Sequence, residues 1–247
     1  MFLGRCRKAA HPLITDDTGT QGKGKYQIEF IGEYGHDSKE GVTTNSILFP
    51  TIPVLSYGIA DTVDLAIGIP YHCIETRQDG LKASERGISD VSLQLKWRFY
   101  EKNGLSFTVK PGVTFPTGDE NKGLGSGKAS YSAYFIMTKE MTPWAFHFNV
   151  GYLRNEYKLL PDEDMNRKDL WHVSLASQVE VVKNVKIVVN IGTQRNSDKT
   201  SNNNPAFVLG GLIYSVKDNI DLDFGVKGGL NKPETDITYL AGITWRL

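Results

Sequence analysis

The feature that most constrains this chain is a two-residue alternation of apolar and polar side chains that continues to the last residue. In the closing stretch "YLAGITWRL", residues 239–247, a bulky apolar or small group stands at every second position. Such alternation is typical of a β-strand with one apolar and one polar face. Chain ends usually fray, so a regular strand at this end indicates that the carboxyl terminus completes a sheet.

The same alternation recurs in about twelve segments, and helical periodicity is hard to find between them. The expected strands are 25–35, 45–58, 63–73, 89–100, 105–115, 128–139, 144–153, 170–182, 185–194, 206–215, 220–229 and 237–247. The second of these contains Pro50 and Pro53, which cannot donate ladder hydrogen bonds, so a bulge or irregular segment is expected there. The chain is therefore predicted to be all-β.

The connections between these strands alternate between short and long along most of the chain. "EKNG" and "KN" are short, whereas "PTGDENKGLGSG" and "RNEYKLLPDEDMNRK" are long and polar. This sorting favours a transmembrane antiparallel up-and-down β-barrel of about 12 strands, with short periplasmic turns and long extracellular loops. We expect the barrel to span 25–247 and residues 1–24 to form a periplasmic tail or a plug in the lumen.

Composition excludes several other classes of protein. Lysine plus arginine number 28 and aspartate plus glutamate number 28, so the net charge is zero and nucleic acid is not an expected partner. No run of about 18 apolar residues occurs, which excludes a transmembrane helix. Cys6 and Cys73 are too few for a disulfide framework. The first residues do not form a visible signal peptide, although a bacterial outer-membrane location is expected.

Aromatic residues gather near the ends of the expected strands, as they do at the two interfaces of a membrane. One group lies beside short turns: Tyr57, Trp97, Phe99, Trp144, Tyr214 and Trp245. A second group lies beside long loops: Tyr71, Phe115, Tyr131, Tyr152, Trp171 and Tyr239. The barrel is closed by pairing the last strand with the first, because an open edge in lipid leaves backbone groups without partners. Trp245 near the end also resembles the C-terminal signal read by the barrel-assembly machinery, although Leu247 stands where phenylalanine is most common.

The chain resembles the outer-membrane transporters grouped as "MetA pathway of phenol degradation" proteins. The stretches that carry the resemblance cover nearly the whole chain: "PLITDDTGTQGKGKYQIE", "ISDVSLQLKWRFYE", "PTGDENKGLGSGKASY", "DLWHVSLA", "PAFVLGGLIYSVKDNIDLDFGVKGGLNKPETD" and "LAGITWRL". Their order is more specific than any one of them. The resemblance implies an outer-membrane β-barrel of Gram-negative type that passes small molecules, aromatic or hydrophobic catabolic substrates among them.

If the apolar faces meet lipid, the opposite faces line the interior. The expected pore-lining residues are Lys96, Arg98, Lys110, His147, Asn149, His172, Gln178, Glu180, Asn190, Asp223, Lys227 and Arg246. This interior is too polar for a dry core and predicts a narrow, weakly ion-selective pore. The segment 11–25 is a plug or a mobile periplasmic tail; as a plug, it would place Asp16 and Asp17 against Arg98 or Lys110.

Other chemistry has weaker support. "GDENKGLGSGK" lacks the spacing of a phosphate loop, 162–169 lacks that of a calcium loop, and His147 and His172 belong to no metal-ligand motif. The protein is not expected to bind a cofactor or a metal, and it is not expected to be an enzyme. Two alternatives stay open: an outer-membrane hydrolase, which needs a serine and a histidine together on the outward face, and a soluble barrel that binds a ligand inside. The histidines that fall in expected strands, His72, His147 and His172, alternate with apolar neighbours and point inward.

Overall fold

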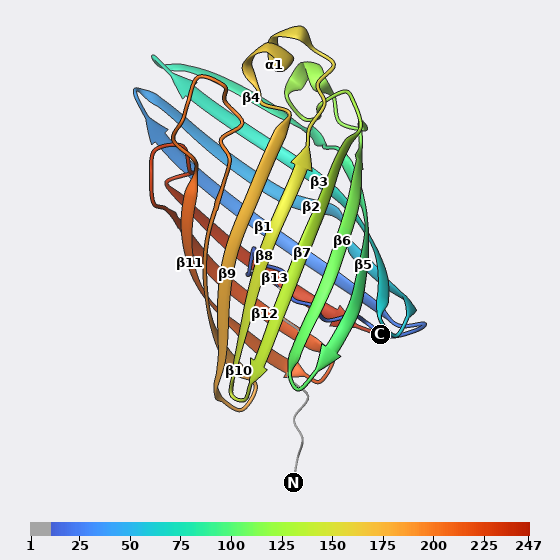
Figure 1. Ribbon diagram of the computed structural model, residues 1–247. Helices are drawn as coiled ribbons and strands as arrows, with labels where there is room; N and C mark the ends of the chain where they lie inside the picture. The colour runs from blue at the N-terminus through green and yellow to red at the C-terminus, as the bar shows by residue number, and fades with distance from the viewer. Residues whose placement is uncertain (1–10) are drawn as a thin grey trace.

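The computed structural model describes residues 11–247, without the side chains of 49–53. The described chain is almost entirely β-structure, as the alternation predicts (Figure 1). The strands are β1 (Tyr26–Lys39), β2 (Val42–Ala60), β3 (Val63–Gln78), β4 (Leu81–Ile88), β5 (Val91–Lys102), β6 (Leu105–Phe115), β7 (Ser130–Met141), β8 (Trp144–Arg154), β9 (Asp169–Val182), β10 (Val185–Gln194), β11 (Ala206–Lys217), β12 (Ile220–Gly229) and β13 (Ile237–Arg246), with a 3-10 turn at Glu120–Lys122 and a short helix α1 (Leu160–Met165).

The strands form one closed antiparallel barrel. Strand β1 pairs with β2 on one side and with β13 on the other, and the remaining strands follow in chain order round to β3, which pairs with β2. Residues 71–78 of β3 pair with β4, and residues 63–68 pair with β5. Strands β4 and β5 therefore act as one interrupted barrel strand, which gives the twelve strands of the predicted fold. The backbone N–H of Leu247 donates to the carbonyl of Tyr26 at 2.9 Å, so the carboxyl end completes the closure.

The two ends of the barrel differ in their connections. At the end that carries the C-terminus, here called the turn end, every connection has two residues: 61–62, 103–104, 142–143, 183–184 and 218–219. The opposite loop end carries the long segments 116–129, 155–168, 195–205 and 230–236, with α1 in the second of them (Figure 1).

Two connections predicted to be long, those between the expected strands 25–35 and 45–58 and between 63–73 and 89–100, are short. The structure continues the strands through them and turns at 40–41 and 79–80 alone. Glu40, Gly41, Asp79 and Gly80 all have positive φ, the backbone conformation that two-residue hairpins require. These hairpins extend beyond the apolar band, so both of their faces are polar. The alternation of apolar and polar residues that predicts a strand is therefore missing there. The irregularity predicted at the prolines of β2 is confirmed, since its pairing with β3 shifts between Pro50 and Ile52 and again before Leu55.

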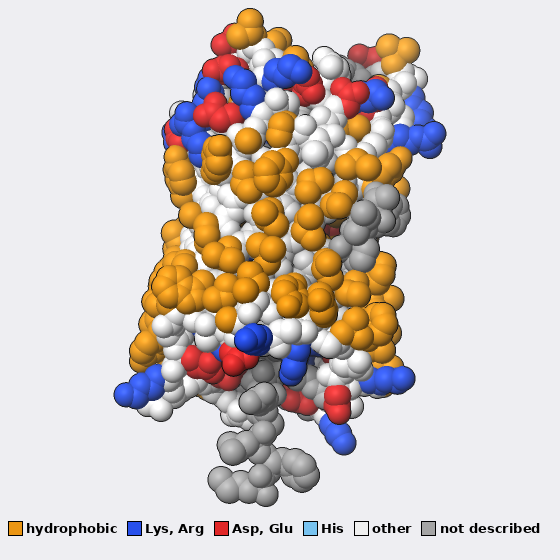
Figure 2. All heavy atoms as spheres, turned by 90° about the vertical axis from the view of Figure 1, so that its right-hand side faces the viewer, with side chains coloured by type: hydrophobic (Ala, Val, Ile, Leu, Met, Phe, Trp, Pro, Cys, Tyr) orange, Lys and Arg blue, Asp and Glu red, His pale blue; other side chains and the backbone are white. Residues whose placement is uncertain are grey.

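The apolar faces point outward around the barrel. Trp97, Leu175 and Ile243 are 48%, 50% and 45% exposed, whereas an interior packing would bury them. Figure 2 shows the consequence on one side of the molecule: apolar side chains form a broad band, and charged side chains gather above and below it. Of the twelve aromatic residues predicted near the interfaces, Tyr71 is half-buried and the others are exposed on this outward surface. No helix described in residues 11–247 is long and apolar enough to cross a membrane.

The interior is less uniformly polar than the sequence indicates. Phe207, Leu209 and Leu240 form a buried apolar cluster on the inward faces of β11 and β13, and Leu13 packs against it. Strand β11 reads "AFVLGGLIYS", which is apolar on both faces, so alternation did not reveal its inward apolar side chains. These residues lie against the N-terminal segment rather than against water.

The outward band predicts a depth-dependent cost of placing charge on it. Leu175 lies in the middle of β9, and Val182 lies on the same strand at the turn end, 62% exposed. We expect Leu175→Arg to destabilise the folded barrel by about 2–4 kcal/mol and Val182→Arg by about 0–1 kcal/mol. Reversible urea unfolding in lipid vesicles measures both; equal losses at the two positions would contradict a membrane-embedded band.

Candidate functional site: the lumen and the segment inside it

The N-terminal segment, defined here as residues 11–24, enters the barrel at the turn end through a tight glycine turn. Gly22 and Gly24 have φ of 90° and 76°, which favours glycine at both positions. The N–H of Gly24 donates to the carbonyl of Gly58 at 2.8 Å, and the N–H of Gly58 donates to the carbonyl of Lys25 at 2.9 Å. A Cβ on Gly58 would lie 1.9 Å from the Gly22 carbonyl oxygen, so β2 contacts the segment with no room for a side chain.

Further inside, the segment forms an ion cluster with the barrel wall. The Asp16 carboxylate accepts from the ammonium groups of Lys110 at 2.7 Å and Lys96 at 2.8 Å. Lys96 also contacts the Asp17 carboxylate at 3.3 Å. Burial raises the pKa of the Asp16 carboxyl, but the charges of Lys110 and Lys96 outweigh burial and hold the pKa below its usual value. The segment is therefore tied to β5 and β6 by charge.

This lowered pKa predicts that the ion cluster resists mild acid. A carboxyl group whose pKa is depressed on folding contributes stability above its unfolded pKa, near 3.8 here, and that contribution is lost only as the pH falls through the lower folded value. The Asp16 contacts should thus persist from pH 7 to about pH 5, well above both values. Single-channel conductance measured at both pH values should agree after correction for bulk conductivity. A reversible opening near pH 5 that Asp16→Asn reproduces at pH 7 would contradict this.

Neutral hydrogen bonds hold the segment to the neighbouring part of the wall, strands β7 to β10. Asn190 accepts from the N–H of Thr15 at 3.0 Å, and Thr15 donates from its hydroxyl to Ser174 at 2.7 Å. The N–H of Thr18 donates to the Thr138 hydroxyl at 3.1 Å. Thr15 and Thr18 are 1% and 3% exposed, so they are buried inside the barrel. With its amide oxygen toward the segment, Asn149 accepts from the Asp16 N–H at 2.7 Å and donates to the Asp16 carbonyl at 2.9 Å.

A row of glycines provides the space for the start of the segment. Gly211 and Gly225 are register partners on β11 and β12, and a Cβ on either would lie 2.8 Å from the ring of Pro12. Close by on β12, the Asp223 carboxylate contacts Nδ1 of His11 at 2.5 Å. The sequence shows these glycines, but nothing local indicates what fills the space above them.

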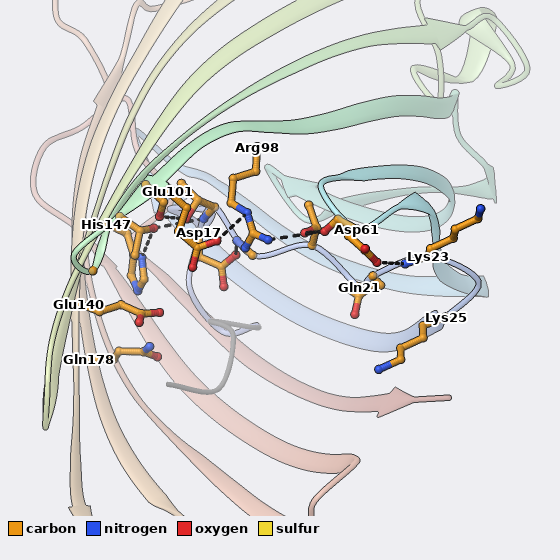
Figure 3. A pocket seen from close by; sticks show the side chains of 17 residues that line it. Asp17, Gln21, Lys23, Lys25, Asp61, Arg98, Glu101, Glu140, His147 and Gln178 are labelled. Atoms are coloured by element: carbon orange, nitrogen blue, oxygen red, sulfur yellow. Dashed lines mark hydrogen bonds and ion pairs between the residues drawn. The ribbon is translucent and has the colours of Figure 1, made fainter. Parts of the chain in front are cut away.

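Two polar cavities lie beside the segment. The larger, about 530 Å³, is at the turn end, and its lining includes Arg98, Glu101, Glu140, His147 and Gln178 (Figure 3). The smaller, about 240 Å³, lies between the segment and the wall formed by β1, β2, β3, β5 and β6. Both cavities are lined by Asp17, Gly19 and Gln21, so they adjoin along the segment.

The structure places most of the predicted pore-lining residues on the inward face, but it pairs Arg98 differently. Arg98 contacts Glu101 at 3.2 Å and the carbonyl of Asp61 at 3.5 Å, not the aspartates of the segment. Glu180 is exposed at the rim, where it accepts from the N–H of Asn184. Two further ion pairs involve predicted pore-lining residues: Lys227 with Glu234 at 2.7 Å and Arg246 with Asp221 at 2.6 Å.

The two buried histidines make neutral hydrogen bonds. Nδ1 of His147 lies 2.9 Å from the Thr138 hydroxyl, and Nε2 of His172 lies 3.0 Å from the Ser174 hydroxyl. Within residues 11–247, no group of three or more histidine, cysteine or acidic side chains is placed to hold a metal ion.

Sequence reasoning missed several interior residues. Glu29 and Asp64 line the smaller cavity together with Gln94. The signal for Asp64 was present, because "VDLAIG" places it opposite Val63 and Leu65. Glu29 was less visible, since its strand "QIEFIGEYG" mixes apolar side chains into the inward face.

One histidine outside the predicted strands lies on the outward face. His36 is in the extended part of β1, and its Nδ1 contacts the side-chain oxygen of Asn45 at 2.8 Å. Ser38 is two residues further along the same face, but its hydroxyl contacts Thr43 at 3.2 Å rather than His36. The serine–histidine contact that a hydrolase needs is thus not formed at this position.

Comparison with known proteins agrees with this architecture. The family model described as MetA-pathway of phenol degradation matches residues 10–247. The chain belongs to this family. Among curated protein sequences, none matches the chain.

Solved structures show the fold that this family member shares. An outer-membrane channel from Pseudomonas putida F1 superposes with a TM-score of 0.73 at 11% identity, covering 94% of this chain and 98% of that one. The NanC porin gives 0.57 at 11% identity, with 89% and 100% covered. The CymD monoaromatic hydrocarbon channel gives 0.52 at 9% identity, with 92% and 89% covered. The chain therefore has the β-barrel fold of these outer-membrane proteins; in barrels of this kind the short turns are periplasmic and the long loops extracellular.

Proposed function

We propose that this protein is a narrow channel for small molecules whose path runs beside the N-terminal segment. The observation that carries the proposal is the pair of adjoining polar cavities inside a closed barrel. A barrel whose interior is only a packed core is filled by side chains and buries few charges, because burying a charge away from water is costly. This interior instead contains charges of both signs and cavities of this size. The predicted pore-lining residues, with Glu29, Asp64 and Gln94 added, would form the walls of this path.

Small solutes, including aromatic catabolic substrates, suit this path. The smaller cavity, about 240 Å³, has room for a molecule of roughly one ring. The family description refers to phenol degradation, and a neighbour of the same fold is named as a monoaromatic hydrocarbon channel. Both signs of charge line the cavity, among them Lys96, Lys110, Asp16 and Asp64, so little selectivity between small anions and cations is expected.

The proposal is tested by reconstitution. Purified barrel, first shown to be folded by heat-modifiable gel mobility, is placed in planar bilayers and in liposomes. We expect a small steady conductance and faster liposome swelling with a one-ring solute that crosses lipid only slowly, such as arabinose, than with a disaccharide. Conductance and swelling equal to those of protein-free membranes would refute a channel.

The C-terminal strand has features that an assembly factor could recognise. Strand β13 pairs with β1 over ten residues, and Trp245 is exposed on the outward face. We infer that the barrel-assembly machinery recognises this strand before closure, when its edge is still free. Deletion of residues 244–247 should then abolish membrane insertion in cells; normal insertion of the truncated chain would argue against this role.

A further inference from the structure

A charged groove opens at the loop end, outside the lumen. It measures about 560 Å³ and is formed by the segments that join β8, β9 and β10, including α1. Five cations and three carboxylates line it, together with one apolar side chain: Arg154, Arg167, Lys168, Arg195, Lys199, Glu163, Asp164, Asp169 and Leu160.

The groove lies next to the aromatic residues at the loop end of β8 and β9, on the side away from the apolar band. Tyr152 of β8 pairs with Trp171 of β9, and the next outward pair along the same strands is Arg154 with Asp169. Because side chains on a strand alternate between faces, Arg154 and Asp169 share the outward face with the two aromatic residues. Tyrosine and tryptophan mark the interface of a membrane, so the groove stands at the level of the lipid headgroups.

Part of the positive charge in the groove has no carboxylate partner. Arg154 pairs with Asp169 at 2.9 Å, and Lys168 pairs with Glu163 at 2.7 Å. By contrast, Arg195 donates to the carbonyl of Asp169 at 3.2 Å, and Lys199 donates to the carbonyl of Glu163 at 2.6 Å. In the part of the chain that the structure describes, neither forms an ion pair.

Arg167, the third groove cation without a salt bridge to a carboxylate of residues 11–247, stabilises a loop. Arg167 donates to the carbonyl oxygens of Asn196, Ser201 and Lys199 at 3.0 to 3.1 Å, so its guanidinium holds the loop that carries Lys199. Its positive charge contributes to the potential in the groove, but its N–H groups are already hydrogen-bonded to these carbonyl oxygens. Among the described residues, Arg195 and Lys199 therefore combine a charge without a salt bridge and N–H groups left to bind an anion.

We propose that this groove binds the phosphate group of a phosphorylated glycolipid in the outer leaflet of the membrane. Arg195 and Lys199 donate to the phosphate, and Arg167 adds to the positive field. Leu160 is 72% exposed in the same groove, which suits an amphiphile better than a free ion. The site is separate from the lumen and does not depend on the channel function.

The test compares lipid binding by two double variants. Arg195→Gln with Lys199→Gln removes the groove cations, and Lys183→Gln with Lys217→Gln removes two exposed cations at the turn end as a matched control. Each folded barrel is titrated in detergent micelles with bisphosphorylated lipid A, with the same lipid after removal of its phosphates, and with inorganic phosphate, and bound ligand is counted by native mass spectrometry.

We expect the unchanged protein and the control to bind phosphorylated lipid A, and the groove variant to bind it about 25-fold more weakly, since each interfacial cation contributes about fivefold. Dephosphorylated lipid and inorganic phosphate should bind weakly to all three proteins. Equal binding of the phosphorylated and dephosphorylated lipids would overturn the proposal, as would equal binding by the groove variant and the control. Tight binding of inorganic phosphate alone would reject the lipid as the ligand.

Discussion

Removal of residues 11–24 is expected to raise the single-channel conductance roughly threefold or more, because a twelve-stranded barrel is wide enough to conduct once its interior is cleared. The segment now occupies part of the lumen with buried side chains such as Thr15, Asp17 and Thr18. Its loss also leaves Lys96 and Lys110 free to face the open path, so the pore should become moderately selective for anions. Planar-bilayer recordings measure the conductance, and the reversal potential in a salt gradient measures the selectivity.

The control for this deletion keeps the segment and removes its charge. Asp16→Asn leaves the hydrogen bonds of Thr15 and Thr18 in place, so it should change the selectivity toward anions with a smaller rise in conductance. Heat-modifiable mobility must show that both barrels are closed before recording. A closed deletion variant with the conductance of the full chain would mean that the segment does not restrict the path.

Substitution of Gly58 is expected to displace the segment without removing it. The Cβ of Gly58→Ala would lie 1.9 Å from the Gly22 carbonyl oxygen, a backbone atom that can move only if the entry turn moves. Gly24 would have to leave a position fixed by its hydrogen bond to the carbonyl of Gly58 on the same strand. We expect cleavage after Lys23 or Lys25 by trypsin to become at least roughly tenfold faster, since proteolysis follows the population of the opened segment.

Gly210→Ala is the matched substitution for this experiment. Gly210 is a strand glycine on β11, and a Cβ there would meet no heavy atom within 4 Å. Cleavage should therefore stay at the rate of the unchanged protein. If the two alanine variants are cleaved at the same rate, the contact between Gly58 and Gly22 does not hold the segment in place.

Alternation made the barrel wall predictable. Strands such as β6 and β12 begin and end at the predicted residues, because a period of two reports directly which side chains meet lipid. The inward positions of Lys96, His147 and Asn190 follow from the same count. The hairpins around Gly41 and Gly80 were not predicted, since beyond the membrane both faces of a strand are polar and the period disappears.

The sequence alone determined where the strands lie, which face meets lipid and which end carries the loops, since each depends on residues a few positions apart. Only the tertiary structure decided where the N-terminal segment lies and which wall residues it meets. Asp16 contacts Lys110, and Thr15 contacts Asn190, across 94 and 175 residues of chain. Such contacts arise when twelve strands close around a shared interior, and no local pattern of side chains encodes that distance.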